Sequence, residues 1–450
     1  MIYSKHNIFS KISGSDNYFI INPLSGSADI LNPPEGEMLQ HFLAGKEVAP
    51  EFLENLTKQG YLVDAAEEER LYRSRYLDFI DTRDKDEVQL FFVPNYSCNF
   101  ACTYCYQDEY ANPGKELSNE VIDAFFSYIT SEFAGRKKYL TIFGGEPLLN
   151  SPKQKAIITY LLEQANAADL EVCFVTNGYA LEEYIDILKT ARIREIQVTL
   201  DGKGSVHDTR RFLKGGGATF EKIVKGIDAC LQEGLPVNLR IVADRENIDG
   251  LPELAQFAID KGWTASNIFK TQLGRNYELH HCSATSEKLF SRISLFETIY
   301  HLVAQHPHIL EFYKPAYSVS KFLAENGNLP DPLFDACPAC KTEWAFDYTG
   351  QIYSCTATVG KEGEALGTFY PEVSRRDDLI NAWESRDVTA IPECSSCNMQ
   401  LACGGGCGSV AKNRTGKICS TDCRPVKELL ELGMSAYFEQ QPLPGSEIQH

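Results

Sequence analysis

The chain has 450 residues, of which 43 are Lys or Arg and 62 are Asp or Glu, so its formal net charge at pH 7 is -19. A chain of this length is expected to contain two or three cores that fold without disulfides. The negative charge disfavours a nucleic-acid substrate, because the basic residues are dispersed among acidic ones instead of gathered in one stretch.

Fifteen cysteines and the hydropathy pattern give expectations about the compartment. No N-terminal segment combines a basic start with a long apolar run, so no signal peptide is expected. No apolar stretch is long enough to predict a membrane-spanning helix. We therefore expect a cytoplasmic protein whose thiols stay reduced.

Residues 1–85 predict a small α/β domain followed by a helical linker. Two extended runs, Tyr18–Ile21 and Ser27–Leu31, are joined by a turn rich in breaker residues. Helices are predicted over Pro34–Leu43 and Pro50–Gly60, where proline opens each helix and glycine ends the second. The highly charged stretch Ala65–Lys85 has helical spacing and is the predicted linker.

Residues 86–285 alternate between apolar runs of strand length and amphipathic runs of helix length. Six strands separated by helices predict a parallel sheet curled into a partial (β/α)6 barrel of the TIM type. The predicted strands are Val88–Val93, Tyr139–Phe143, Glu171–Val175, Glu195–Leu200, Val237–Val242 and Asn267–Leu273. The predicted helices are Asn119–Phe133, Lys153–Ala165, Leu181–Thr190, Thr219–Glu233 and Glu253–Lys261.

The pattern changes after residue 285. A helical segment, Ser286–His306, opens a connector over residues 286–334, and a loop-rich domain with clustered cysteines occupies residues 335–450. Cys173 in an apolar strand and Cys230 on an amphipathic helix are expected to be small core residues. Cys282 lies beside two histidines, a pattern that a loop produces by coincidence more often than as a metal site.

Three cysteines, Cys98, Cys102 and Cys105, follow the first predicted barrel strand on one loop. Catalytic groups of α/β barrels gather at this carboxyl end of the strands. Spacings of three and two residues let a tight loop bind three irons of a cubane cluster and leave the fourth iron without a thiolate. A structural zinc site needs four closed ligands, which this loop alone does not supply.

This motif, with Tyr104 directly before its last cysteine, resembles the signature of the radical S-adenosylmethionine (radical SAM) superfamily. The resemblance implies that the open iron binds SAM and that an electron splits SAM to give a 5'-deoxyadenosyl radical. It also implies further SAM contacts after later strands, although Arg240 could equally be a solvated or paired charge. These implied contacts are Gly144, Gly145, Glu146, Pro147, Thr176, Asn177, Asp201 and Arg240, together with Tyr104.

The C-terminal cysteines resemble the SPASM extension of radical SAM enzymes that mature peptides and proteins. By this resemblance, one auxiliary 4Fe-4S cluster would be held by Cys337, Cys340, Cys355 and Cys407, and the other by Cys394, Cys397, Cys403 and Cys423. Cys423 is preferred to Cys419 because the start of a terminal helix follows it, as in the family. Two zinc ribbons are the alternative, but they leave Cys403 and Cys407 unexplained.

The resemblance implies a radical SAM/SPASM peptide maturase with SAM and three 4Fe-4S clusters as cofactors. Such an enzyme would abstract hydrogen from a ribosomally made peptide and install an oxidative cross-link, either a thioether or a C-C bond. Its partners would be a precursor peptide or protein with a leader segment and a low-potential electron donor of the flavodoxin or ferredoxin type. The first 80 residues look like a winged-helix domain that adds a leader strand to its sheet edge, with a purely structural cap as the alternative.

Three other functions remain open at this level. A sulfatase-maturase-like enzyme that generates formylglycine would resemble this chain in all three clusters, but Thr356 stands where that family has an aspartate base after the auxiliary cysteine Cys355. A non-catalytic iron-sulfur protein that binds peptides or transfers electrons would not need the ordered motifs after the barrel strands. An RNA-modifying radical SAM enzyme is disfavoured by the acidity of the chain.

Overall fold

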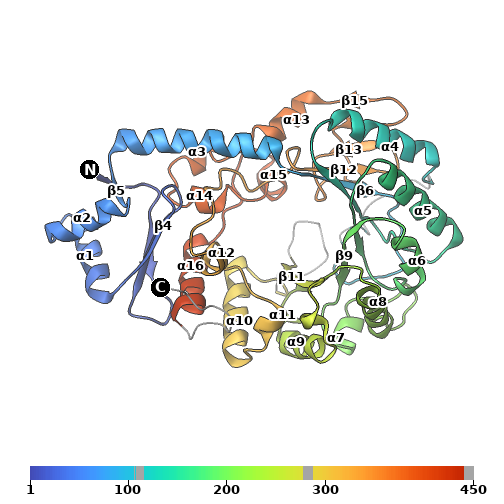
Figure 1. Cartoon of the computed structure of the whole chain (residues 1–450), viewed down its shortest axis with the longest axis horizontal. Helices are drawn as coiled ribbons and strands as arrows, with labels where there is room; N and C mark the ends of the chain where they lie inside the picture. Colours follow the sequence, from blue (N-terminus) through green and yellow to red (C-terminus); the bar gives the residue numbers. More distant parts are fainter. Residues whose placement is uncertain (106, 108–115, 277–286, 440–450) are drawn as a thin grey trace.

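The computed structural model describes residues 1–105, 107, 116–276 and 287–439. The fold is α/β with a central, mostly parallel sheet of ten strands in the order β11-β10-β9-β8-β7-β6-β12-β13-β14-β15 (Figure 1). No helix in these ranges is long and apolar enough to span a bilayer. Cys282 and its two histidine neighbours lie outside the described residues.

The N-terminal region holds a three-stranded antiparallel sheet of β2 (Ile8–Lys11), β3 (Tyr18–Asn22) and β4 (Ser27–Leu31). The predicted strands and helices are confirmed, with small shifts of their ends, whereas β2 was not predicted. The helices are α1 (Pro33–Leu43) and α2 (Pro50–Lys58), and β1 (Ile2–Tyr3) pairs with β5 (Leu62–Val63).

The small sheet is covered on both faces. Ile20 on one face packs in a core with Leu39 of α1 and Phe52 of α2. On the other face, Phe19 packs in a core with Leu430 of the C-terminal helix α16 (Val426–Met434). The first and last parts of the chain therefore share a core, and α16 lies beside the small sheet in Figure 1.

The predicted linker helix is α3 (Ala65–Lys85), which crosses the top of Figure 1 from the N-terminal region towards the central sheet. Its Tyr72, Tyr76 and Phe79 surround the buried ring of Phe334, with ring centroids 5.1 to 5.6 Å away. The helix is therefore packed against the C-terminal region along one side, which a charged linker sequence does not reveal.

The six predicted parallel strands are confirmed as neighbours in chain order. They are β6 (Val88–Val93), β7 (Lys138–Ile142), β8 (Val172–Thr176), β9 (Ile193–Thr199), β10 (Val237–Ala243) and β11 (Phe269–Arg275). Between them lie α4 (Asn119–Glu132), α5 (Pro152–Ala167), α6 (Ile185–Leu188), α7 (Ser205–Asp208), α8 (Phe220–Gln232) and α9 (Leu251–Asp260). The helix predicted over Leu181–Thr190 is shorter than expected, since a 3-10 turn at Glu182–Tyr184 replaces its first part.

The C-terminal region contributes to the same sheet. Strand β12 (Glu343–Asp347) pairs in parallel with β6, and β13 (Gln351–Tyr353), β14 (Gly367–Thr368) and β15 (Ser374–Arg375) follow in antiparallel order. The prediction of a merely loop-rich segment was therefore incomplete. The remaining helices are α10 (Arg292–Gln305), α11 (Ile309–Phe312), α12 (Ser320–Asn326), α13 (Asp377–Glu384), α14 (Gln400–Cys403) and α15 (Gly408–Thr415).

Candidate active site

The loop that carries the first three cysteines packs backbone to backbone against the loop after β7. The amide of Gly145 donates to the carbonyl of Asn95 at 3.1 Å, and the amide of Glu146 donates to that of Ser97 at 2.8 Å. A Cβ atom on Gly145 would lie 2.2 Å from the Ser97 carbonyl oxygen, and Gly144 has φ +143°. Only glycine fits such an approach, so the Gly-Gly pair fixes the position of the cysteine loop.

The carboxylate of Glu146 braces two neighbouring loops. It is buried and accepts hydrogen bonds from the Thr176 hydroxyl and the Asn177 amide, both at 2.6 Å. Burial raises the pKa of this carboxyl, and those hydrogen bonds oppose the increase. The Asn177 side-chain amide in turn lies 3.8 Å from the Cys98 sulfur. These predicted site residues thus meet beside the first cysteine, and the Glu146 side chain is engaged with the protein itself.

Tyr104 and Asp201 come together as predicted site residues, in a network that includes two arginines. The Tyr104 hydroxyl donates to an Asp201 oxygen at 2.5 Å and accepts from Arg211 at 2.8 Å. Asp201 also lies 3.3 Å from the buried guanidinium of Arg210. The Asp201 carboxylate is therefore satisfied inside the protein, where it holds the cysteine loop to the end of β9.

Arg211 is a site residue that the sequence did not single out. Burial alone would lower its pKa, but the neighbouring Cys102 and Tyr104 outweigh burial and leave the pKa well above its usual value. Its Nε atom is buried and has no hydrogen-bond partner within the described residues. A permanent cation next to a cysteine loop stabilises thiolates and other anions. The only signal in the sequence is the pair Arg210-Arg211, which is weak without the fold.

The three thiols of the loop lie near one another. Burial raises the pKa of Cys98 to about 12, and Glu146, Cys102 and Cys105 contribute to the increase. Such a thiol is protonated at neutral pH and becomes a ligand only when a metal replaces its proton. Three thiols, a buried arginine and a glycine-lined approach fit a cluster bound by three cysteines.

The C-terminal thiols affect one another's pKa within each of the two predicted ligand sets. Burial raises the pKa of Cys355, and the nearby Glu343, Cys337 and Cys407 raise it further. Burial also raises the pKa of Cys340, and the next largest contribution comes from Cys355. Burial raises the pKa of Cys394 to about 11, and the nearby thiols Cys403, Cys397 and Cys423 contribute to the increase. Cys423 thus acts on this second group. The structure brings together the thiols Cys337, Cys340, Cys355 and Cys407, and separately Cys394, Cys397, Cys403 and Cys423.

The thiols of each group affect one another's pKa through space. Within the described ranges, no three Cys, His, Asp or Glu side chains are close enough to hold a single metal ion. A zinc ion needs sulfurs within about 4 Å of one another, because each Zn-S bond is about 2.3 Å long. A 4Fe-4S cluster spaces its thiolates more widely. Two zinc ribbons stay the alternative to two clusters at these cysteines.

Glycines let the loop between the two groups fold tightly. Gly404, Gly405 and Gly406 have φ of +62°, +71° and +71°, and a Cβ on Gly406 would lie 2.0 Å from the Asp422 carbonyl oxygen. A Cβ on Gly408 would lie 3.0 Å from the Cys337 sulfur. The segment around these glycines therefore connects one cysteine group directly to the other.

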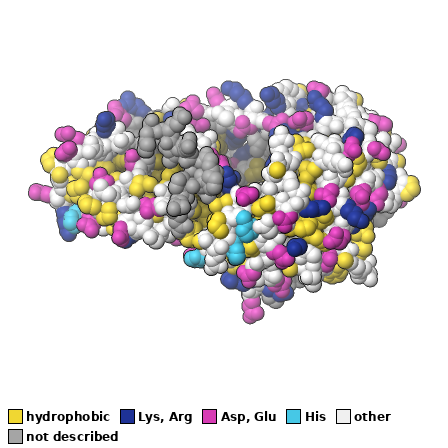
Figure 2. Space-filling view, turned by 60° about the horizontal axis from the view of Figure 1, so that its bottom comes forward, with side chains coloured by type: hydrophobic (Ala, Val, Ile, Leu, Met, Phe, Trp, Pro, Cys, Tyr) yellow, Lys and Arg dark blue, Asp and Glu magenta, His cyan; other side chains and the backbone are white. Residues whose placement is uncertain are grey.

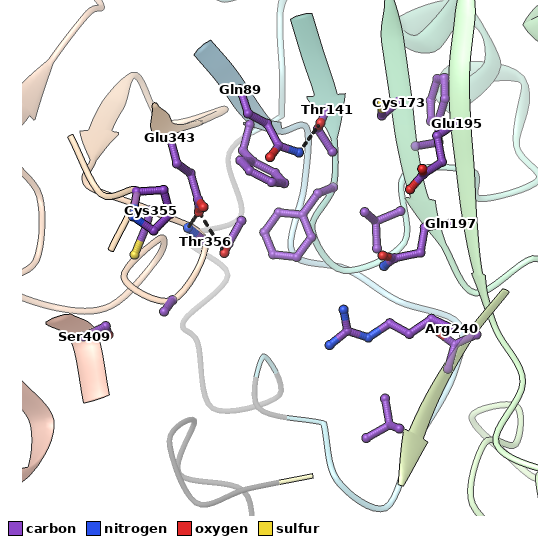
Figure 3. A pocket seen from close by; sticks show the side chains of 18 of the residues that line it. Gln89, Thr141, Cys173, Glu195, Gln197, Arg240, Glu343, Cys355, Thr356 and Ser409 are labelled. Atoms are coloured by element: carbon purple, nitrogen blue, oxygen red, sulfur yellow. Dashed lines mark hydrogen bonds between the residues drawn. The ribbon is translucent and has the colours of Figure 1, made fainter. Parts of the chain in front are cut away.

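A cavity of about 620 Å³ lies between the central sheet and the first auxiliary group. Tyr104 from the cysteine loop and Cys355 from the auxiliary group line the same cavity, and Figure 3 shows its walls. Cys173, expected in the core, is buried but also borders this space. Its lining further includes Gln89, Thr141, Glu195, Gln197, Thr199, Arg240, Lys270, Cys337, Glu343, Thr356, Cys407 and Ser409.

Arg240 extends from β10 into this cavity, facing the auxiliary side in Figure 3. Lys270 on the same wall pairs with Glu195. By contrast, the Arg240 guanidinium has no hydrogen bond or ion pair with any residue in the described ranges. A half-buried guanidinium without a described partner favours an anionic ligand, and a SAM contact and a solvated charge both stay predictions for Arg240.

Glu343 is a carboxylate of the opposite wall that the sequence did not identify. It accepts hydrogen bonds from the Thr356 amide at 2.8 Å and from the Thr356 hydroxyl at 3.1 Å (Figure 3). Burial raises its pKa, and the two hydrogen bonds from Thr356 lower it. The threonine that replaces an expected aspartate thus holds a glutamate from β12 beside Cys355.

The fold is α/β, and three thiols follow β6 on a loop whose Tyr104 lines a large cavity. Residues 92–258 match the model of the radical SAM superfamily. These residues, which run from β6 to α9, are a radical SAM domain.

Three similar proteins extend this comparison. The chain is 32% identical over 163 residues to the probable GTP 3',8-cyclase of Archaeoglobus fulgidus, a match that covers 36% of this chain and about half (51%) of that relative. It is 24% identical over 376 residues to the serine-type anaerobic sulfatase-maturating enzyme of Bacteroides thetaiotaomicron, covering 76% of this chain and 86% of that one. The crystal structure of Streptococcus suis SuiB bound to the precursor peptide SuiA is similar at a TM-score of 0.54 and 14% identity, covering 94% and 98% of the two chains.

Proposed function

We propose that the protein is a radical SAM/SPASM maturase that installs an oxidative cross-link, a thioether or a C-C bond, in a ribosomally made peptide. The observation that carries the proposal is the cavity between Tyr104 of the cysteine loop and Cys355 of the first auxiliary group. A substrate in this cavity is within reach of both centres. The volume of about 620 Å³ accommodates SAM together with one or two side chains of a peptide.

The cysteine loop would hold the SAM-binding cluster through Cys98, Cys102 and Cys105. When bound, the cluster and SAM supply a radical that removes hydrogen from an unactivated C-H bond. The protein's own residues bind and orient SAM and exclude water from it. The proposed SAM-facing residues are Tyr104, Gly144, Gly145, Glu146, Pro147, Thr176, Asn177, Asp201 and Arg240.

Two auxiliary 4Fe-4S clusters complete the proposal, one held by Cys337, Cys340, Cys355 and Cys407 and the other by Cys394, Cys397, Cys403 and Cys423. A group beside the cavity can accept the electron that leaves a substrate radical as a cross-link closes. The first auxiliary group is suited to this role because Cys337, Cys355 and Cys407 line the cavity.

The N-terminal region is proposed to bind the leader segment of the precursor. Within the described sheet β4 pairs only with β3, so β4 offers an edge to an added strand. Ile30 on β4 is 43% exposed, which provides an apolar contact at that edge. Support comes from the similarity to SuiB over 94% of this chain, since that structure contains a precursor peptide.

A second candidate is a formylglycine-generating sulfatase maturase. It is favoured by the similarity to the Bacteroides enzyme over 76% of the chain. Glu343, held by Thr356 beside Cys355, places a carboxylate in the cavity, which such an oxidation would need to remove a substrate proton. The two candidates differ in their product, because an aldehyde reacts with hydrazines and a cross-link does not.

The test uses protein purified without oxygen, supplied with iron, sulfide, dithionite and SAM, and incubated with short peptides encoded beside its gene. We expect 5'-deoxyadenosine and a peptide lighter by about two hydrogens that does not react with hydrazine. An aldehyde product establishes the second candidate, and the lack of deoxyadenosine contradicts both. The variant Cys98→Ala should lose deoxyadenosine formation and bound iron, whereas Cys173→Ala, in the same cavity wall, should retain its iron.

A further inference from the structure

The side-chain amide of Asn177 faces the sulfur of Cys98. Asn177 directly follows β8 and is 6% exposed, and its Nδ2 atom lies 3.8 Å from the Cys98 sulfur. The same nitrogen donates to the side-chain oxygen of Asn99 at 2.8 Å. An amide nitrogen carries two hydrogens. One hydrogen therefore serves Asn99, and the other is available to the sulfur.

The partners of this amide fix its orientation. The side-chain oxygen of Asn177 accepts a hydrogen bond from the backbone amide of Tyr179 at 2.9 Å. Because a backbone N-H only donates, the oxygen must face Tyr179 and the nitrogen must face Cys98. The backbone amide of Asn177 donates to the buried carboxylate of Glu146 at 2.6 Å. The loop after β8 is thus held through both its backbone and its side chain.

The sulfur of Cys98 also meets a second N-H group. The backbone amide of Phe100 donates to this sulfur at 3.4 Å. The backbone between them is fixed, because the Lys214 amide donates to the carbonyl of Asn99 at 2.8 Å. When a metal replaces the thiol proton, the sulfur can only accept hydrogen bonds. Two N-H donors then face the negative charge of a thiolate.

Hydrogen bonds to a ligating sulfur change how readily an iron-sulfur cluster accepts an electron. Reduction adds negative charge that the thiolates share, and N-H groups stabilise this charge, so they raise the reduction potential. The net charge of -19 acts in the opposite direction. Acidic and basic side chains are interspersed on the face shown in Figure 2, where solvent and salt screen them. The donors next to the sulfur should therefore have the larger effect.

We propose that the Asn177 side chain donates to the Cys98 thiolate and thereby raises the reduction potential of the cluster held by Cys98, Cys102 and Cys105. The inference rests on the proposed function, because it requires the cluster that this function assigns to the three cysteines. In the reduction the cluster gains one electron from a donor such as dithionite, which is oxidised, and no bond to iron forms or breaks. Asn177 acts through Cys98 in this role, which is separate from the contact with SAM proposed for it.

The test is a redox titration of the iron-loaded protein without SAM, followed by electron paramagnetic resonance. The signal of this cluster is the one that is missing from Cys98→Ala/Cys102→Ala/Cys105→Ala. Asn177→Leu removes the donor at nearly constant side-chain size, so the potential should become more negative. We expect the ratio of reduced to oxidised cluster at a fixed potential to fall about ten-fold, since hydrogen bonds to ionised groups are about twice as strong as neutral ones. For one electron, a ten-fold change corresponds to about 59 mV.

A second variant and a remote control separate this effect from a structural one. Asn177→Asp keeps the shape of the side chain but replaces the N-H donor by an oxygen, so the potential should fall further than in Asn177→Leu. Asn22→Leu is the matched control on β3. Asn22 is 1% exposed, and its side-chain oxygen also accepts from the backbone amide two residues on, that of Leu24, at 2.9 Å. Asn22→Leu should leave the potential unchanged even where it lowers stability.

The inference is overturned if both Asn177 variants keep the wild-type potential; a loss of SAM affinity alone would then make Asn177 a SAM contact and nothing more. An equal shift in Asn22→Leu overturns it too, since the shift would then reflect general destabilisation. Should Asn177→Leu fail to fold, Asn177→Asp tests the same direction. A wild type that shows the expected shifts but forms no deoxyadenosine with SAM and dithionite would contradict the proposed function and leave this inference standing, so the two failures are distinguishable.

Discussion

The guanidinium of Arg386 lies 3.3 Å from the carboxylate of Asp335, and the two side chains are 0% and 2% exposed. The same guanidinium donates to the carbonyl oxygens of Gly405 at 2.8 Å, Ser420 at 3.1 Å and Ile418 at 3.0 Å. Arg386 thus joins chain segments from both auxiliary cysteine groups around one buried charge pair.

Replacing Arg386 by glutamine should destabilise this region strongly. The change leaves a buried carboxylate without one of its cations and several carbonyls without donors, and breaking such a pair costs about 3–5 kcal/mol. Thermal unfolding of Arg386→Gln should therefore begin at a clearly lower temperature than in the wild type. Arg70→Gln, which breaks the exposed pair of Arg70 and Glu67, should cost less than about 1 kcal/mol. Equal shifts in the two variants would contradict this assignment.

Gly145→Ala should displace the cysteine loop. The added methyl group would lie 2.2 Å from the Ser97 carbonyl oxygen, so one of the two loops must move. We expect a loss of SAM affinity of about 100-fold or more, because small displacements of positioning groups have effects of that size. Equilibrium dialysis with SAM measures this. Gly250→Ala is the matched control, since its methyl group would contact only Val206, at an ordinary 3.8 Å. Similar SAM affinity in the two variants would contradict the role of Gly145 in positioning the cysteine loop.

Arg240→Leu should weaken ligand binding without unfolding the protein. The guanidinium has no partner among the described residues, so its removal leaves no described group unpaired. A hydrogen bond to a charged group contributes about 1.5–3 kcal/mol, which corresponds to a loss of affinity for SAM of about 10-fold to 150-fold. The unfolding temperature should stay within about 2 °C of the wild type. Unchanged SAM affinity would exclude SAM as the anion that Arg240 binds and leave a peptide carboxylate.

His6→Phe should reduce the loss of stability in mild acid. His6 is fully buried, stacks on Tyr72 and has no partner within the described residues for either ring nitrogen. Burial lowers the pKa of His6 to about 4, and the positive charge of the neighbouring Lys5 contributes to the decrease. The unfolded chain takes up a proton below its ordinary pKa of about 6.5 while the folded chain does not, so stability falls as the pH decreases from about 6.5 towards 4.

At about pH 5.5 this histidine should cost about 1.4 kcal/mol relative to about pH 7.5. The measurement is the free energy of unfolding of the wild type and of His6→Phe at both pH values, without change of buffer salt. The variant retains a ring against Tyr72, so any packing effect is the same at the two pH values and cancels. An identical decrease in both proteins would show that His6 does not cause it.

Much of the central sheet was predictable because each strand carries its own signal. Val88–Val93 is a continuous apolar run, and the structure gives β6 the same bounds. Strand β12 was missed, since Glu343–Asp347 is short and lies among cysteine loops, and only its pairing with β6 makes it a strand. The ends of the other predicted barrel strands shift by one or two residues, because pairing decides them.

The sequence by itself determined the chemistry that three closely spaced cysteines after a first strand can support, because ligand spacing along one loop is a local property. It also determined which later loops carry glycine and polar residues. Only the tertiary structure decided that Asp201 and Glu146 are satisfied within the protein, that Arg211 lies beside Cys102, and that Glu343 meets Thr356 beside Cys355. These relationships join residues far apart in the chain, and burial and pairing across such separations depend on how the elements pack.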